Sequence, residues 1–167
     1  ASQNQFDKAV ENYKRSIKIN PNYAQAYNNL GIVFHKLDKI NEAVDKYRKA
    51  ISLNSDFAEA FCNLGNAFRE LNNPTDALPY FKKAIKIKPN YVEAFNSLGE
   101  TNQILLNKKE ALANFQEAIK IKPNYAEAYN NLGLLLDDLT RFDESLSSYN
   151  KAIKLKPNYE KPYNNLG

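Results

Sequence analysis

One ten-residue stretch decides the fold of this chain: NYVEAFNSLG, residues 90–99. Close copies of this stretch follow one another every 34 residues and begin at Asn22, Asp56, Asn124 and Asn158. The five glycines of the chain fall on the same period, at residues 31, 65, 99, 133 and 167. A fixed period of about 20 to 50 residues is typical of a repeat array, in which each unit packs mainly against its neighbours.

The bulk composition excludes several classes of protein. The 167 residues are 43% hydrophobic and 25% charged, as in an ordinary soluble protein, and the net charge of +4 is too small to indicate nucleic-acid binding. We find no signal peptide and no apolar run of about 18 residues, so we expect no membrane span and a cytoplasmic location. Because methionine is missing even at position 1 and both ends cut into the repeat, we expect a piece of a longer protein.

Each unit is predicted to form two helices. In the unit that begins at Ala24, apolar residues recur at three- and four-residue spacing over two stretches, namely Tyr27, Leu30, Phe34 and Leu37, then Ala43, Tyr47, Ala50 and Ile51. One helix pair cannot bury such stripes alone, so successive pairs must stack. We therefore predict a single all-α array over residues 1–167. It contains the second helix of a partial repeat at 1–23, full repeats at 24–57, 58–91, 92–125 and 126–159, and the start of a further repeat at 160–167.

Local signals predict where these helices begin and end. The asparagine or aspartate at residues 22, 56, 90 and 124 stands three residues before a glutamine or glutamate, an arrangement typical of a capping box. The second helices are predicted to begin near Asn73 and Asn107. Proline inside a helix costs about 3 kcal/mol, so we expect the helix that contains Pro79 to start late or to kink there.

The glycine at repeat position 8 indicates close approach by a neighbouring helix, because glycine inside a helix costs about 1 kcal/mol relative to alanine. We expect the matching surface to come from small residues of the second helices, namely Ala43, Ala77, Ala111 and Ser145 with Ala50, Ala84, Ala118 and Ala152. Where polar residues replace apolar or small ones, at Asn102 and Ser145, we expect looser packing.

This pattern resembles the tetratricopeptide repeat (TPR) family. The second full unit matches the family motif throughout, with Phe61, Leu64, Gly65, Phe68, Ala77, Phe81, Ala84 and Pro89. The resemblance covers essentially the whole chain. It implies an all-α solenoid, a right-handed superhelix of antiparallel helix pairs whose first helices line a concave groove.

Asparagine recurs on the predicted groove. Repeat position 6 reads Asn29, Asn63, Ser97, Asn131 and Asn165, although asparagine is a mediocre helix former. A side-chain amide offers donors and an acceptor that match a peptide backbone unit, and the pattern is similar to the asparagine ladder in the TPR superhelix of O-GlcNAc transferases. The alternative is that asparagine is merely a tolerated solvent-facing residue. We expect the same groove to contain Asn28, Asn96 and Asn130 at position 5, Asn66 and Leu134 at position 9, and Arg69 and Asp137 at position 12.

Nothing in the chain predicts catalysis. His35 is the only histidine and Cys62 the only cysteine, so a metal cluster or a Cys–His pair lacks partners, and no glycine-rich phosphate loop is present. We therefore expect neither enzymatic activity nor a cofactor. The favoured interpretation is a protein-protein interaction module that binds an extended peptide. The alternatives are the substrate-recruiting arm of a larger enzyme, such as a glycosyltransferase, and a scaffold whose truncated ends associate head to tail. The partner and the oligomeric state are not written in the sequence.

Overall fold

The computed structural model describes residues 2–165, with side chains from residue 5 onward, and over this range the chain contains ten helices and no strand. The helices form two compact units, Ala1–Lys88 and Pro89–Gly167, here called unit 1 and unit 2. Within the described range no helix combines the length and the apolar character that crossing a bilayer requires.

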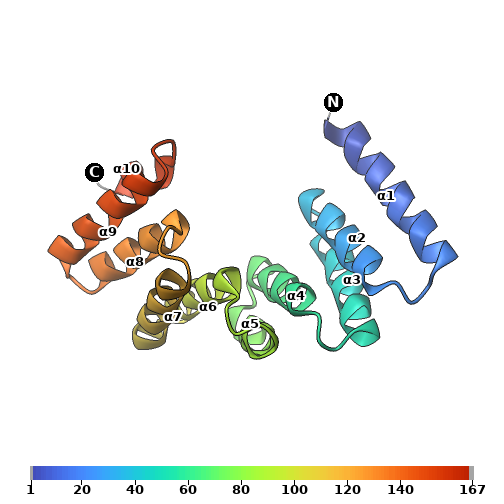
Figure 1. Ribbon diagram of the computed structural model, residues 1–167, viewed down its shortest axis with the longest axis horizontal. Helices are drawn as coiled ribbons and strands as arrows, with labels where there is room; N and C mark the ends of the chain where they lie inside the picture. Colours follow the sequence, from blue (N-terminus) through green and yellow to red (C-terminus); the bar gives the residue numbers. More distant parts are fainter. Residues whose placement is uncertain (1, 166–167) are drawn as a thin grey trace. The chain divides into compact units, whose positions relative to one another are not determined.

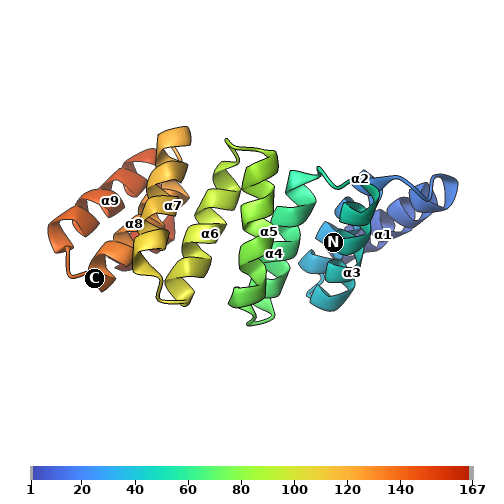
Figure 2. The same ribbon diagram turned by 90° about the horizontal axis from the view of Figure 1, so that it is seen from below.

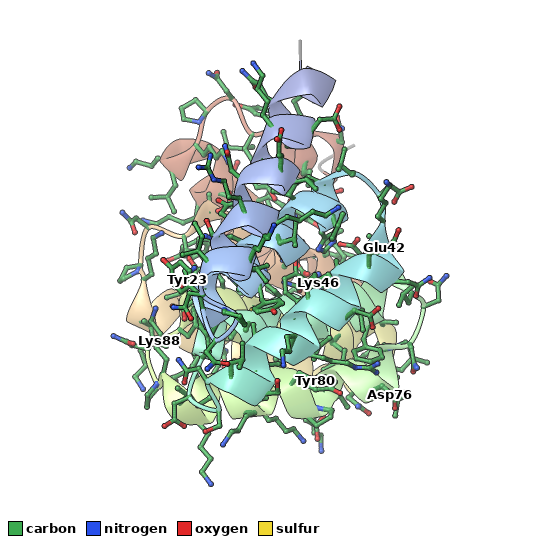
Figure 3. The ribbon with its side chains drawn as sticks, turned by 90° about the vertical axis from the view of Figure 1, so that its right-hand side faces the viewer. Tyr23, Glu42, Lys46, Asp76, Tyr80 and Lys88 are labelled. Carbon is green, nitrogen blue, oxygen red and sulfur yellow. The ribbon has the colours of Figure 1, made fainter. Side chains whose placement is uncertain are left out.

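Unit 1 contains five helices: α1 (Ser2–Ile19), α2 (Ala24–Lys36), α3 (Ile40–Leu53), α4 (Ala58–Glu70) and α5 (Pro74–Ile87). The pairs α2–α3 and α4–α5 each pack as an antiparallel hairpin, and α3 also packs against α4 (Figures 1 and 2). Figure 3 places Glu42 and Lys46 on α3, and Asp76 and Tyr80 on α5. The Tyr80 ring stacks on Phe68 of α4 with ring centroids 5.3 Å apart, which joins the two helices of this hairpin.

Unit 2 contains the other five helices: α6 (Val92–Ile104), α7 (Lys108–Ile121), α8 (Ala126–Asp138), α9 (Phe142–Leu155) and α10 (Glu160–Asn165). It repeats the same plan, with hairpins α6–α7 and α8–α9, and α10 packs on α9 (Figure 1). First and second helices therefore alternate within each unit. The division into one continuous array of repeats stays a prediction.

The turn inside each hairpin uses a left-handed residue. Asp38, Asn72, Leu106 and Thr140 have φ between 56° and 60°. In the first of these turns the Asp38 amide donates to His35 O and the Lys39 amide donates to Phe34 O. This is the Schellman arrangement, which satisfies the last carbonyls of a first helix. Glycine is the usual residue at such a position, so Leu106 carries a backbone strain that the sequence does not announce.

The predicted capping boxes are wrong. The first helices of the four complete repeats begin directly after Tyr23, Phe57, Tyr91 and Tyr125. None of these N-cap residues makes a side-chain hydrogen bond to its helix. Asn22 lies two residues before the helix begins, in a turn where its own amide donates to Asn20 Oδ1. The second helices do begin next to Asn73 and Asn107, as predicted, but the Asn73 side chain donates to the Asp76 carboxylate.

The prediction for Pro79 is wrong about the start of the helix. The helix α5 begins at Pro74, in register with the other second helices, and continues without interruption to Ile87. Pro74 occupies the first turn, where a missing N–H costs nothing, whereas Pro79 lies in the interior and removes one backbone donor.

The glycine prediction is right that the second helix approaches too closely for a side chain at this position, and wrong about which residues of that helix make the contact. A Cβ built on Gly31, Gly65, Gly99 or Gly133 would lie 2.5 to 2.8 Å from an aromatic ring of the second helix in the same hairpin. The rings belong to Tyr47, Phe81, Phe115 and Tyr149, which are at most 1% exposed. A buried ring, rather than a small-residue surface, therefore excludes a side chain at repeat position 8.

The two polar replacements are buried and hydrogen-bonded. Ser145 Oγ donates to Gly133 O at 2.9 Å, and Asn102 Nδ2 donates to Leu98 O at 3.0 Å. Asn102 Oδ1 also accepts from Asn107 Nδ2 at 3.3 Å. A buried polar group with its partners in place carries little penalty, so these contacts give no support to the expected loosening.

Candidate functional site

Side-chain amides link successive first helices in unit 1. Asn28 of α2 and Asn63 of α4 are 35 residues apart, which is one repeat plus one residue. The Asn63 Nδ2 donates to Asn28 Oδ1 at 3.0 Å. An asparagine at repeat position 6 therefore reaches back to position 5 of the preceding first helix.

The same bond recurs twice in unit 2. Asn131 Nδ2 donates to Asn96 Oδ1 at 3.1 Å, and Asn165 Nδ2 donates to Asn130 Oδ1 at 3.0 Å. Glu100 adds a carboxylate to the first of these links, since its Oε1 accepts from Asn131 at 2.7 Å and from Asn96 at 3.0 Å. These amides therefore hold neighbouring first helices together.

The position-5 asparagines do not face solvent, contrary to the prediction. Asn28, Asn96 and Asn130 are 2%, 6% and 1% exposed, because each is covered by the first helix of the next repeat. Ser97, the member of position 6 that lacks an amide, is 8% exposed. These four residues lie in the interior and are not displayed to a ligand.

The position-6 asparagines remain half-exposed beside them. We call the surface carrying Asn29, Asn63 and Asn66 the amide face of unit 1, and the surface carrying Asn131, Leu134 and Asn165 the amide face of unit 2. Asn29 differs from the rest, because its Oδ1 accepts from Gln25 of the same helix at 2.9 Å and, among the described residues, it makes no bond to another helix. The asparagines are thus neither idle surface residues nor simple ligand groups.

Repeat positions 9 and 12 vary between the units. In unit 1, Asn66 Oδ1 accepts from Arg69 Nη2 at 3.3 Å. In unit 2, Leu134 is 36% exposed, and Asp137 Oδ2 accepts from Tyr149 Oη at 2.7 Å. Burial, together with this hydrogen bond, raises the pKa of the Tyr149 phenol. Asp137 is therefore bound to the second helix of its own hairpin.

The glutamates at repeat position 2 also have a structural partner that the sequence did not suggest. Lys88, labelled in Figure 3, donates to Glu59 Oε1 at 3.1 Å, and Lys156 donates to Glu127 Oε1 at 2.9 Å. Burial alone would raise the pKa of Glu127, but the hydrogen bond from Lys156 and its positive charge outweigh it, so the pKa lies below its usual value. These ion pairs join the end of a second helix to the start of its own first helix.

Two members of this site were missed in the sequence. Gln25 bonds to Asn29 four residues along the same helix, and Glu100 bonds to Asn131 31 residues away, so the separation of 35 residues that links positions 5 and 6 would have revealed neither. Within the described residues no group of three His, Cys, Asp or Glu side chains is placed to hold a metal ion. The chemistry of the site is that of amides, which bind hydrogen-bonding groups of either polarity.

Stacked helix hairpins with a fixed 34-residue period define the class of helical-repeat solenoids. The protein-family sequence model described as TPR repeat matches residues 1–38, 33–72 and 108–139. A second family model, described as Tetratricopeptide repeat, matches residues 58–91 and 126–159. The chain belongs to the TPR family and is an all-α TPR solenoid. TPR arrays are protein–protein interaction modules, and this chain is one of them.

Solved structures show the same fold. The crystal structure of MamA is similar with a TM-score of 0.81 and 26% identity, over 96% of this chain and 94% of that chain. YrrB, described as a TPR protein with an unusual peptide-binding site, is similar with a TM-score of 0.77 and 25% identity, over 99% of this chain and 85% of that chain. A thermophilic TPR protein from Thermus thermophilus is similar with a TM-score of 0.80 and 21% identity, over 98% of this chain and 90% of that chain. A search of curated protein sequences found no match.

Proposed function

We propose that the amide faces bind an extended peptide segment of a partner protein by its backbone. The observation that carries the proposal is that asparagines recur half-exposed at one repeat position, held by bonds to the neighbouring helix. A side chain that is already fixed loses little conformational entropy when it binds, so its hydrogen bonds contribute more fully to affinity. The similarity to YrrB, which is described as having a peptide-binding site, supports the same interpretation.

The two units differ in what their asparagines still offer. Asn131 donates to Asn96 and Glu100 and accepts from Asn130, so its amide is largely committed. Asn63 uses one N–H toward Asn28, and within the described part of the chain its Oδ1 accepts nothing. Asn63 can therefore pair with both the C=O and the N–H of one peptide unit, and we expect unit 1 to contribute more to backbone recognition than unit 2.

Side chains of the ligand would be read by the variable positions. Arg69 in unit 1 and Asp137 in unit 2 carry opposite charges, and Leu134 with Ile104, which are 36% and 57% exposed, provides an apolar contact in unit 2. Sequence preference would therefore come from repeat positions 9, 12 and 13, while position 6 contributes affinity to any extended chain.

The decisive experiment selects 12-mer peptides from a random phage-displayed library on the wild-type chain and measures their affinity by fluorescence polarisation. Asn29→Ala is the cleanest variant, because Asn29 makes no inter-helix bond in the described structure. We expect it to weaken binding about threefold to tenfold, as the loss of one hydrogen bond would. Asn41→Ala, on the exposed surface of α3, is the matched control and should bind as the wild type does.

N-methylation of the peptide backbone provides the second arm. If the amides read the backbone, at least one methylated position should abolish binding while the side chains stay unchanged. Selected peptides that bind Asn29→Ala and Asn63→Ala as tightly as the wild type, and that tolerate methylation at every position, would show that the amide faces are not the binding site.

A further inference from the structure

A cluster of side chains fills the surface where α3, α4 and α5 adjoin in unit 1. The Phe68 ring of α4 stacks on the Tyr80 ring of α5 with the two planes 3° apart, and the Arg48 guanidinium of α3 lies 5.6 Å from the centroid of the Phe68 ring. Both rings pack against core residues that include Val44 of α3 and Leu64 of α4. We call Arg48, Phe68 and Tyr80 the ring cluster of unit 1. This surface of unit 1 is therefore closed by the chain's own aromatic side chains.

The equivalent positions of unit 2 carry smaller side chains. Two repeats further along the chain, the three positions of the ring cluster hold Gln116, Leu136 and Ser148, in that order. Leu112 and Leu132 occupy the positions of the two core residues beneath the rings. A hollow of about 210 Å³ lies here, and all five of these residues line it. Unit 2 is therefore hollow at the positions where unit 1 is filled by two rings, and we call this space the unit-2 hollow.

The unit-2 hollow has the size and the apolar wall that one aromatic ring requires. Its wall is made by Leu112 of α7 and by Leu132 and Leu136 of α8, and Leu136 is only 3% exposed. A cavity of about 150 Å³ lined by apolar side chains is large enough to bind benzene. The hollow can therefore take a ring of that size and remove it from water, which is favourable for any apolar surface.

The polar groups around the hollow are already paired with one another. Ser148 Oγ donates to Glu144 O at 2.9 Å, and Arg141 donates to the Glu144 carboxylate through Nε at 2.7 Å and Nη2 at 2.6 Å. A ligand therefore needs no charge of its own to satisfy them. Two bonds to one carboxylate hold the Arg141 guanidinium as a flat plate, and such a plate stacks well on an aromatic ring. The chemistry of the hollow thus fits an uncharged ring.

We propose that the unit-2 hollow binds the ring of a phenylalanine or tyrosine side chain on a segment of a partner protein. The occupant is aromatic because the same repeat positions hold stacked rings in unit 1, against the same kind of apolar wall and beside an arginine. A buried aromatic anchor of this kind contributes much of the binding energy of a protein interface. None of the residues that line the hollow belongs to an amide face, so the proposal stands independently of backbone recognition.

The first test uses p-cresol, which reproduces the tyrosine side chain. Methyl ¹H–¹³C NMR of the labelled wild-type chain follows a titration from about 0.1 mM to about 20 mM. The methyl signals of Leu112, Leu132 and Leu136 should shift with a common dissociation constant on the order of 1–10 mM, as expected for so small a ligand. Leu64, the equivalent of Leu132 in unit 1, is the internal control and should not shift. If the three leucines moved no more than Leu64, the proposal would be wrong.

The second test exchanges side chains between the units. Leu136→Phe combined with Ser148→Tyr rebuilds the two rings in unit 2 and should lower the affinity for p-cresol about tenfold or more. Both rings are tolerated at these positions in unit 1, so the variant should keep its helix content by circular dichroism. Asn150→Tyr is the matched control, since it adds the same ring to an exposed position of α9 outside the hollow. In the reverse direction, Phe68→Leu combined with Tyr80→Ser should create a second site, which the Leu64 methyl signals would report. A folded rebuilt variant that bound p-cresol as the wild type does would exclude the hollow as the site.

The third test asks whether a protein segment uses the hollow. Phage displaying random 12-mer peptides are first depleted on the rebuilt variant, which removes peptides that bind the amide faces, and are then selected on the wild type. The selected peptides should contain a phenylalanine or tyrosine whose replacement by leucine weakens binding about tenfold. They should bind Asn29→Ala and the wild type equally, which separates this site from the amide faces. Peptides that kept their affinity after that replacement would contradict an aromatic anchor.

Discussion

Replacing Asn131 by alanine should destabilise the protein, whereas the same change at Asn29 should not. Both residues occupy repeat position 6 and lie in the identical sequence YNNLG. Asn131 bonds to a neighbouring helix, through Asn96 Oδ1 and Glu100 Oε1, whereas Asn29 makes no such bond among the described residues. The pair therefore separates the energy of the inter-helix link from the intrinsic helix propensity of the residue.

The magnitude follows from what each substitution leaves behind. Alanine at residue 131 removes the donor to Oδ1 of Asn96, a residue that is 6% exposed, and an unpaired buried acceptor costs about 1–3 kcal/mol. Alanine also improves helix propensity by up to about 0.7 kcal/mol, but that gain is common to both sites and cancels in the comparison. Asn29→Ala loses only the exposed bond from Gln25, a contact of the kind that contributes about 0.2–0.5 kcal/mol.

Urea unfolding followed by far-UV circular dichroism measures the difference. With a slope of about 2 kcal/mol per molar, the midpoint of Asn131→Ala should lie roughly 0.25–1.4 M below that of Asn29→Ala, once the smaller loss at Asn29 is subtracted. Asn63→Ala should behave like Asn131→Ala, because it removes the donor to Oδ1 of Asn28, a residue that is 2% exposed. If Asn131→Ala unfolded at the same urea concentration as Asn29→Ala, the amide links would have no part in stability.

Four further changes test the packing and the pH response. Gly99→Ala should lower stability by about 1–2 kcal/mol, because its Cβ would lie 2.5 Å from the Phe115 ring, and Phe115→Leu in the same chain should make the change less costly, as a double-mutant cycle would show. Leu106→Gly should raise the unfolding midpoint by the equivalent of about 1 kcal/mol, since Leu106 has φ 60°. Pro79→Ala should raise it by about 1–3 kcal/mol by restoring a backbone donor within α5, and an unchanged midpoint would contradict the assigned cost. The pKa of Tyr149 is raised in the folded state, so the protonated phenol contributes fully to the free energy of unfolding below the unfolded pKa of about 10, and this contribution is lost as the pH rises further. Tyr149→Phe has no proton to lose and should therefore shift alkaline unfolding, followed by circular dichroism, to higher pH.

Much of the fold was predictable because its determinants are local. The 34-residue period, the two apolar stripes in each unit and the starts next to Asn73 and Asn107 can all be read along the chain. The need for glycine at repeat position 8 was predictable for the same reason, because a residue that destabilises helices and still recurs inside them indicates a place with no room for a side chain. Sequence spacing could not identify the aromatic ring that fills this space, because that ring lies on the other helix of the hairpin.

The candidate site was predicted only in part. Asparagine at position 6 was found, but Asn28, Asn96 and Asn130 were expected on an open face and are buried. The capping assignment failed for a related reason, because Glu59 pairs with Lys88, which lies 29 residues away. Both errors concern polar side chains whose partners belong to another helix.

The sequence by itself therefore determined that the chain forms repeated helix pairs, that second helices begin next to Asn73 and Asn107, and which residues are apolar. Helical periodicity and backbone sterics act within a few residues, so these properties need no knowledge of neighbouring repeats. Only the tertiary structure decided which side of each first helix meets the preceding one, and hence which amides are consumed in links such as Asn63 to Asn28. That choice depends on the rotation and offset between stacked helices, which are set by the packing of whole side-chain surfaces and not by the spacing of residues along one helix.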